Sequence, residues 1–119
     1  MKDWMENYEI DIKGEFINIK DDSLSREKSL QLFRVIQESV HNAVRHGKAT
    51  QVTVFLQDDE GKIYFKVVDN GIGFDIEKAR EQGVGLYHMI ERIEMVGGEI
   101  KCFSHMGGHT RVEGYIPIH

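Results

Sequence analysis

A carboxylate and a carboxamide stand one helical turn apart in the segment 33–46, at Glu38 and Asn42. A side-chain amide oxygen is a hard, neutral ligand that suits Mg²⁺. A carboxylate one turn earlier can accept the proton of an attacking hydroxyl, imidazole or water. The same two residue types are also common on the exposed face of an ordinary amphipathic helix. The surrounding segments must therefore decide between the two interpretations.

The same segment carries apolar residues at helical spacing. At about 100° per residue, one arc of a helix collects Phe33, Ile36, Val40, Ala43 and Val44. The opposite arc collects Arg34, Glu38, Asn42 and Arg45. The pattern predicts a helix from about Arg26 to His46, capped by Ser25 or Ser23 and ended by Gly47 in a left-handed conformation.

Two glycine-rich segments follow, Asp69-Asn-Gly71-Ile-Gly73 and Gly83-Val-Gly85. Asn-Gly is a strong hairpin signal, but the residues after Gly73 lack the alternation of a second strand. We therefore expect Gly71 and Gly73 to let backbone come close to another group. Gly83-Val-Gly85 opens a helical repeat, where free N–H groups can bind phosphate oxygens, although a plain loop-to-helix turn would look the same. Neither segment completes a dinucleotide fingerprint or a Walker phosphate loop.

Size and composition favour one globular domain. The chain has 119 residues, and a formal net charge of −5 argues against sequence-independent nucleic-acid binding. No apolar run approaches the roughly 20 residues that cross a bilayer, and the start of the chain lacks the apolar core of a signal peptide. We expect a cytoplasmic location without direct membrane contact. Cys102, the single cysteine, is expected to be a strand residue.

The remaining patterns predict the elements that would position these groups. Strands are expected at Tyr8–Ile12, Gln51–Leu56, Lys62–Val68, Glu99–Ser104 and Thr110–Ile118, with the second and third forming an antiparallel hairpin. A second helix should begin near Leu86 and end at Gly97-Gly98, after a mobile loop at Phe74–Gln82. This order predicts a two-layer α+β sandwich, with both helices on one face of a mixed, mainly antiparallel sheet.

Taken in order, these motifs resemble the ATP-binding catalytic domain of sensor histidine kinases, whose Bergerat-type fold is shared with DNA gyrase, HSP90 chaperones and MutL. The segments 37–46, 69–73 and 83–86 resemble the N box and the first and second glycine boxes of that family. The resemblance extends over residues 8–118. The patterns Arg34-x-x-Gln37-Glu38 and Gly85-Leu-x-x-Met89-x-x-Arg92 resemble the branch that contains NarX, DegS and DesK.

The resemblance implies a Mg·ATP site that delivers the γ-phosphoryl group to a histidine. It implies that Asn42 ligates Mg²⁺ and that Glu38 orients or deprotonates the accepting group. Asp69 would accept a hydrogen bond from the adenine amino group, a role that suits an acceptor-only carboxylate, with support from Thr110. The other nucleotide-binding residues that it implies are Gly71 and Gly73 at the base and sugar, Gly83, Gly85 and Leu86 at the phosphate end, and Arg45 and His46 beside the phosphates.

The chain departs from the family pattern in two places. The closing Gly-x-Gly-Thr motif reads Gly107-Gly-His109-Thr110, so a histidine stands at a usual glycine position and the local backbone is expected to differ. No helical segment with a phosphoacceptor histidine precedes Tyr8. We therefore expect residues 1–119 to be a catalytic domain from a longer sensor kinase, with Met1 an internal methionine or an artificial start. Its expected partners are the dimerisation and phosphoacceptor domain and, indirectly, a response regulator.

Two alternatives remain open on the sequence alone. A stand-alone anti-sigma-factor serine kinase of the same fold would phosphorylate a protein serine and bind a sigma factor. A non-catalytic interaction module would keep the sheet and helices but bind no nucleotide.

Overall fold

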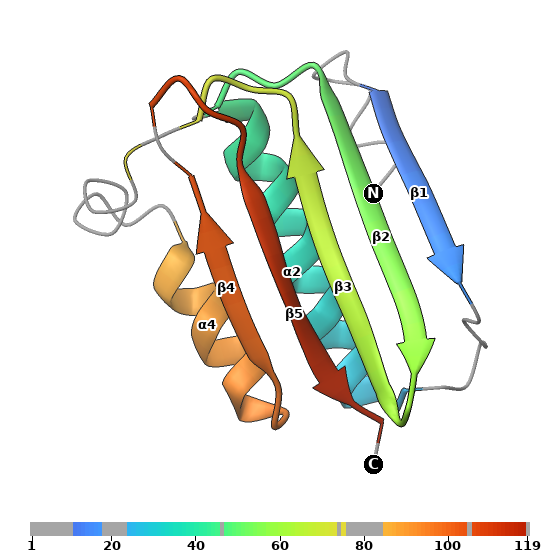
Figure 1. Cartoon of the computed structure of the whole chain (residues 1–119). Coiled ribbons are helices and arrows are strands. Elements are labelled where there is room, and N and C mark those ends of the chain that lie inside the picture. The colour runs from blue at the N-terminus through green and yellow to red at the C-terminus, as the bar shows by residue number, and fades with distance from the viewer. Residues whose placement is uncertain are drawn as a thin grey trace.

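The computed structural model describes residues 11–17, 24–45, 47–73, 75, 85–104 and 106–118, with only the backbone for Asp11. Its elements in chain order are β1 (Asp11–Ile17), α2 (Arg26–Arg45), β2 (Gln51–Asp59), β3 (Lys62–Asp69), α4 (Leu86–Met95), β4 (Glu99–Phe103) and β5 (Arg111–Pro117). This is the predicted order of strand, helix, hairpin, helix and hairpin (Figure 1). Within the described ranges no helix is long and apolar enough to span a membrane.

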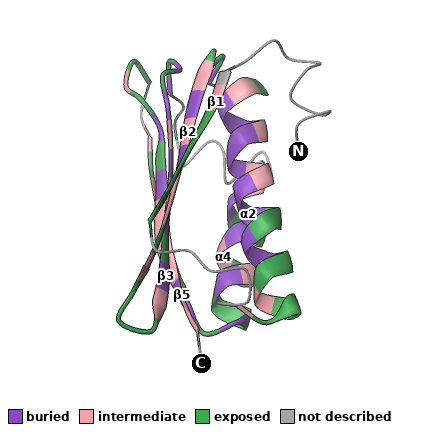
Figure 2. Cartoon of the chain, turned by 90° about the vertical axis from the view of Figure 1, so that its right-hand side faces the viewer, coloured by how far each residue is buried: buried purple, intermediate pink, exposed green. Residues whose placement is uncertain are grey.

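The strands form one sheet in the order β1-β2-β3-β5-β4. β1 runs parallel to β2, and the other neighbouring strands are antiparallel. Both helices lie on one face of this sheet (Figure 2). The predicted two-layer α+β sandwich is therefore confirmed.

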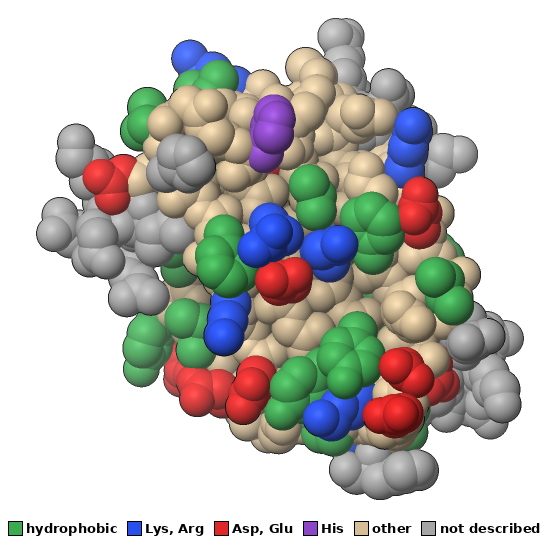
Figure 3. Space-filling view, in the orientation of Figure 1, with side chains coloured by type: hydrophobic (Ala, Val, Ile, Leu, Met, Phe, Trp, Pro, Cys, Tyr) green, Lys and Arg blue, Asp and Glu red, His purple; other side chains and the backbone are tan. Residues whose placement is uncertain are grey.

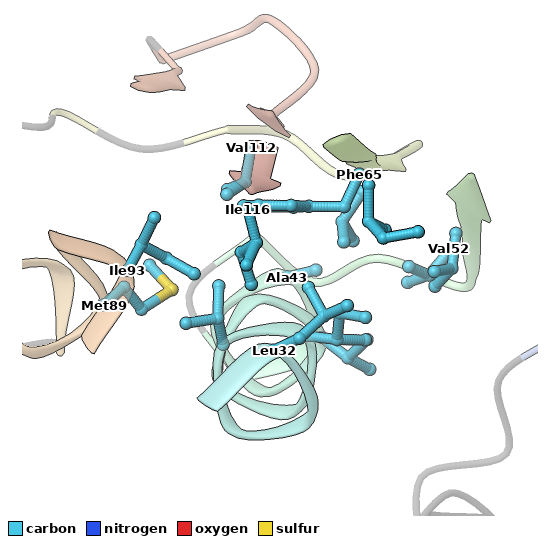
Figure 4. Close-up of a cluster of buried hydrophobic side chains, with 14 of the residues drawn as sticks. Leu32, Ala43, Val52, Phe65, Met89, Ile93, Val112 and Ile116 are labelled. Atoms are coloured by element: carbon cyan, nitrogen blue, oxygen red, sulfur yellow. The ribbon is translucent and has the colours of Figure 1, made fainter. Parts of the chain in front are cut away.

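The hydrophobic core fills the space between the helices and the sheet. Val35 and Val40 of α2 and Ile93 of α4 are fully buried, and they belong to one hydrophobic cluster with strand residues such as Phe65 and Ile116. Figure 4 draws this cluster between the helices and the sheet. Alternate residues of the strands are buried, because successive side chains point to opposite faces of a sheet. Packing of this kind fixes where the polar residues of α2 lie.

No helix of the described residues lies over the opposite face of the sheet. Basic, acidic and hydrophobic side chains are interspersed there (Figure 3). Three cations lie over aromatic rings, with distances to the ring centroids of 4.4 to 4.7 Å: Lys62 over Tyr115, Lys66 over Phe55 and Arg111 over Phe103. Interspersed charge of this kind opposes edge-to-edge and face-to-face association of exposed sheets.

Helix α2 begins as predicted, and its buried stripe differs from the predicted arc at two residues. Ser25 caps it, since its Oγ accepts the N–H of Lys28 at 3.2 Å. Phe33, expected in the core, is 39% exposed, whereas Asn42, expected on the outer arc, is 5% exposed. Ile36, Val40 and Ala43 are buried as predicted, so the arc prediction was wrong only at its edges. Helix α2 packs against α4 as well as the sheet, and this widens its buried stripe toward the side that carries Asn42.

Two other boundaries differ from the sequence predictions. The first strand was expected at Tyr8–Ile12, but the described strand extends through Gly14 to Ile17, and residues 8–10 lie outside the described part. Gly47 was expected to end α2 in a left-handed conformation. The left-handed residue described there is instead Lys48, with φ 53°, and Gly47 has a different reason to be glycine. A Cβ at Gly47 would lie 2.8 Å from the carbonyl oxygen of Ala43.

Candidate functional site

Asp69 is a buried carboxylate at the end of β3. Its Oδ1 accepts the backbone N–H of Gly71 at 2.7 Å, and the backbone N–H of Thr110 also donates to the carboxylate. Burial raises the pKa of Asp69, and the two N–H groups and the charge of His109 oppose that rise. A carboxylate has about four acceptor positions. Asp69 can therefore accept a further hydrogen bond from a ligand N–H.

Asn70, the residue after Asp69, connects the Asp69 segment to the start of β2 by hydrogen bonds. Its Oδ1 accepts the backbone N–H groups of Thr50 and Gln51, each at 2.9 Å, and its Nδ2 donates to the Thr50 hydroxyl at 3.0 Å. Sequence analysis assigned Asn70 no role. The tendency of asparagine to hydrogen-bond backbone groups in turns was the signal that could have identified it.

The first glycine segment packs directly on the end of α2. A Cβ on Gly71 would overlap the carbonyl oxygen of Gly47, and that oxygen accepts the N–H of Ile72 at 2.7 Å. Gly47 in turn donates its N–H to the carbonyl of Asn42 at 3.1 Å. The predicted close approach at Gly71 is thus confirmed, and the approaching group is backbone of this chain. Gly73 adopts the left-handed region, with φ 74°.

The turn before β5 covers the other side of the same segment. Gly107, with φ 85°, donates its N–H to the carbonyl of Ile72 at 2.7 Å. His109 Nδ1 lies 3.3 Å from the carbonyl oxygen of Gly71. His109 has no positive φ, which explains why this turn accepts a side chain where the family pattern has glycine. Thr110 itself is buried, and its backbone also receives the N–H of Asp69 at 3.1 Å.

Glu38 lies at a separate place, in a cleft of about 300 Å³ between α2 and α4. The residues that line this cleft are Arg34, Gln37, Glu38, Gly85, His88, Met89 and Arg92. Arg92 donates to Gln31 at 3.0 Å, while Arg34 has no hydrogen bond or ion pair with the described residues. The Glu38 carboxylate lies against the backbone of Gly85. A carboxylate in an open cleft that also contains Arg34 and Arg92 can meet a group that arrives from outside.

Asn42 lies one turn beyond Glu38 on α2. Its side chain is buried, and its Nδ2 is the one buried side-chain nitrogen or oxygen in the described residues without a hydrogen-bond partner. A buried amide group without a partner carries a free-energy cost that a bound ligand can remove. Rotation of the amide can turn either Oδ1 or Nδ2 toward such a ligand. The residue therefore fits a role in holding a hydrated cation or a phosphate.

Not every residue implied by the resemblance joins these groups. Arg45 is exposed, and its guanidinium lies 3.4 Å from His41 on the outer side of α2. Leu86, the first residue of α4, is buried in the core. His46 and Gly83 lie outside the described residues, as do Phe74 and residues 76–84, which include most of the predicted mobile loop.

Comparison with known families decides what this arrangement is. Residues 27–119 match the family model described as "Histidine kinase-, DNA gyrase B-, and HSP90-like ATPase". The chain belongs to this ATPase family. Membership gives the domain ATP binding as its general property, and the matched region contains both the Asp69 segment and the Glu38 cleft.

Among curated relatives, the ATPase domain resembles sensor histidine kinases. It is 37% identical over 101 residues to the sensor histidine kinase LiaS of Bacillus subtilis, a match covering 85% of this chain and 28% of LiaS. It is 37% identical over 87 residues to the sensor protein VraS of Staphylococcus epidermidis, covering 73% of this chain and 25% of VraS. The chain thus spans between a quarter and a third of the length of these relatives.

Solved structures show the same fold at lower identity. The ATP-binding domain of PrrB from Mycobacterium tuberculosis matches with a TM-score of 0.71 and 19% identity, covering 98% of this chain and 86% of that one. The Acinetobacter baumannii histidine kinase AdeS matches with a TM-score of 0.73 and 16% identity, covering 99% of this chain and 59% of that one. These structures establish the fold of the ATPase domain.

Proposed function

We propose that this ATPase domain binds Mg·ATP and passes the γ-phosphoryl group to a histidine on another domain of a longer sensor kinase, for onward transfer to a response regulator. The observation that carries the proposal is the buried Asp69 carboxylate, which backbone N–H groups of Gly71 and Thr110 orient. A carboxylate fixed in this way accepts a hydrogen bond from the exocyclic amino group of adenine and rejects a base that presents an acceptor at that position.

Glu38 supplies the chemistry at the other end of the site. The bond between the γ-phosphorus and the β,γ-bridging oxygen breaks, a bond from that phosphorus to an imidazole nitrogen forms, and ADP leaves. Glu38 orients the imidazole or accepts the proton that the other ring nitrogen releases as the lone-pair nitrogen attacks. Phosphoryl transfer depends mostly on positioning and charge stabilisation, so a correctly placed carboxylate and cationic neighbours such as Arg34 are adequate for it.

Asn42 is the proposed protein ligand for Mg²⁺. Mg²⁺ usually keeps several waters and takes few protein ligands together with substrate phosphates, so one amide on α2 is sufficient. When bound, the cation would neutralise charge on the phosphates. Asn42 would hold this hydrated cation beside α2, one turn from Glu38.

The longer protein is part of the proposal. The sensor-kinase relatives LiaS and VraS support a parent kinase over the anti-sigma-factor serine kinase as the source of this domain. Its partners would be the dimerisation and phosphoacceptor domain of that kinase and, indirectly, its response regulator. A cytoplasmic location, where ATP is available, accompanies this proposal.

Calorimetric titration of the chain with Mg·ATP tests the nucleotide site. Asp69→Asn should weaken binding about 10- to 100-fold, the range expected for one hydrogen bond to a charged group. Asp59→Asn, on the exposed end of β2, is the matched control and should bind like the wild type. Omitting Mg²⁺ should weaken binding of the wild type. A wild-type protein that gives no binding, and no thermal stabilisation by Mg·ATP, would favour the non-catalytic interaction module.

A further inference from the structure

Gly85 touches the carboxylate that the proposed function uses as its acid/base group. Gly85 is the residue before α4 and has a left-handed backbone, with φ 87°. A Cβ built on it would overlap Oε1 of Glu38 and would lie 2.7 Å from Cδ and 3.0 Å from Cγ of the same side chain. Three atoms of Glu38 therefore occupy the space that any other residue at position 85 would need.

The two helices that carry these residues cannot separate easily. Met89 donates its N–H to the carbonyl of Gly85 at 3.0 Å, and its buried thioether lies 3.4 Å from the hydroxyl of Ser39 on α2. Ser39 also donates to the carbonyl of Val35 at 2.8 Å. A side chain at position 85 would therefore push the flexible Glu38 side chain aside before it moved the packed helices.

We propose that Gly85 is a positioning residue for Glu38. The missing side chain keeps the carboxylate at the cleft between α2 and α4, where Arg34 and His88 line the approach. This role rests on the proposed function and differs from phosphate binding, which the family resemblance implies for Gly85. It predicts that a substitution at Gly85 slows turnover rather than weakening nucleotide binding.

Gly61 provides the matched control. It has φ 78°, close to that of Gly85, but a Cβ on it would meet no atom within 4 Å. Gly61→Ala therefore measures the cost of a left-handed alanine alone, and the difference between Gly85→Ala and Gly61→Ala measures the collision with Glu38.

The experiment compares Gly85→Ala, Gly61→Ala, Glu38→Ala and the double variant Gly85→Ala/Glu38→Ala. Melting temperatures are measured first, then Mg·ATP affinity by calorimetry and, with the phosphoacceptor domain of the parent kinase added, the rate of ADP formation at saturating Mg·ATP. Gly85→Ala should lower the melting temperature more than Gly61→Ala does, and in the Glu38→Ala background that excess should vanish. Gly85→Ala should slow turnover about 100-fold, a typical result of a misplacement of about 1 Å, while affinity stays within about 2-fold.

Rescue by a shorter acid separates positioning from general damage. Gly85→Ala/Glu38→Asp should turn over faster than Gly85→Ala alone, because the shorter side chain leaves room for the Cβ. Two results would overturn the inference: melting-temperature losses for Gly85→Ala and Glu38→Ala that simply add, or a loss of Mg·ATP affinity as large as the loss of turnover. A wild type without Mg·ATP binding would instead reject the proposed function, and the melting-temperature cycle would still decide whether Gly85 positions Glu38.

Discussion

The Asp69 segment and the Glu38 cleft are held in place by different interactions. Asp69 is buried and receives backbone N–H groups from two directions, while its neighbour Asn70 is bound to the start of β2. Glu38 is only partly buried and is positioned by contact with the backbone of Gly85. Hydrogen bonds fix direction as well as distance, whereas a packing contact only excludes positions.

The difference matches what each end has to do under the proposed function. An adenine base is the same in every cycle, so its acceptor can be fixed in advance by the fold. An acceptor histidine arrives from another domain and leaves again, so the carboxylate that meets it must face an open cleft. Variants that damage one end and spare the other test this comparison.

Glu38→Gln should produce the largest effect on turnover. Loss of an acid/base group typically slows a reaction about 100- to 10,000-fold. The rate at which the phosphoacceptor domain of the parent kinase gains label from γ-radiolabelled ATP measures this effect, and the affinity for Mg·ATP should stay near that of the wild type. Glu91→Gln is the control, because it makes the same change from carboxylate to carboxamide at an exposed position on α4. It should leave both the turnover rate and the Mg·ATP affinity unchanged. If affinity fell as much as turnover, Glu38 and Asp69 would not have separate roles.

Gly71→Ala should damage the Asp69 end selectively. Its Cβ would overlap the carbonyl oxygen of Gly47, a backbone atom that cannot turn aside. Overpacking of this kind costs about 1–3 kcal/mol, and the shift of the Asp69 segment should weaken Mg·ATP binding at least about 10-fold. Urea unfolding and calorimetry measure the two effects.

Gly14→Ala is the control for that substitution. Its nearest neighbour, at 2.7 Å, is the ring of Phe16, an exposed side chain that can rotate away. Gly14→Ala should therefore lower the free energy of unfolding only slightly and leave the Mg·ATP affinity unchanged. Equal effects of Gly14→Ala and Gly71→Ala would contradict the importance of the backbone contact at Gly47.

The smallest expected effect is a pH dependence with opposite signs for stability and binding. Burial raises the pKa of Asp69 in the folded state, so folding favours its protonated form. Its contribution to stability is therefore present below the unfolded pKa of about 3.9 and is lost as pH rises through the raised native value. Urea unfolding should show wild type gaining stability relative to Asp69→Asn as pH falls across that window.

Nucleotide binding should move the other way. The ionised carboxylate is the acceptor for the adenine amino group, so affinity should fall as pH drops through the raised pKa. Calorimetry at several pH values measures the Mg·ATP affinity of the wild type and of Asp69→Asn. The variant should lack the part of the pH dependence that comes from the Asp69 carboxylate. A wild-type affinity that rises as pH drops would remove Asp69 from the proposed role.

The sequence predicted the order of the elements, because the strand alternation and the helix stop at Gly97-Gly98 depend on local patterns. It also predicted the turn between β2 and β3, where Glu60 and Gly61 both have positive φ, as a two-residue type I′ turn requires. Local chemistry was sufficient for these features.

Features that depend on tertiary contacts were predicted poorly or not at all. The buried arc of α2 depends on where α4 packs, so Phe33 and Asn42 were assigned to the wrong sides. The contact between Gly71 and Gly47 joins residues that lie 24 positions apart, and the glycine pattern gave no indication of which backbone would approach. The same limit applies to Gly85 and Glu38, whose proximity only the fold reveals.

Helix α2 serves two purposes with a single run of 20 residues. Its inner stripe belongs to the hydrophobic core, and the same turns carry Glu38 and Asn42. The groups to which we assign catalysis and metal binding therefore lose their positions when the helix unfolds. On heating, ATP turnover should disappear over the same temperature interval as the helical circular-dichroism signal, without a folded but inactive form in between.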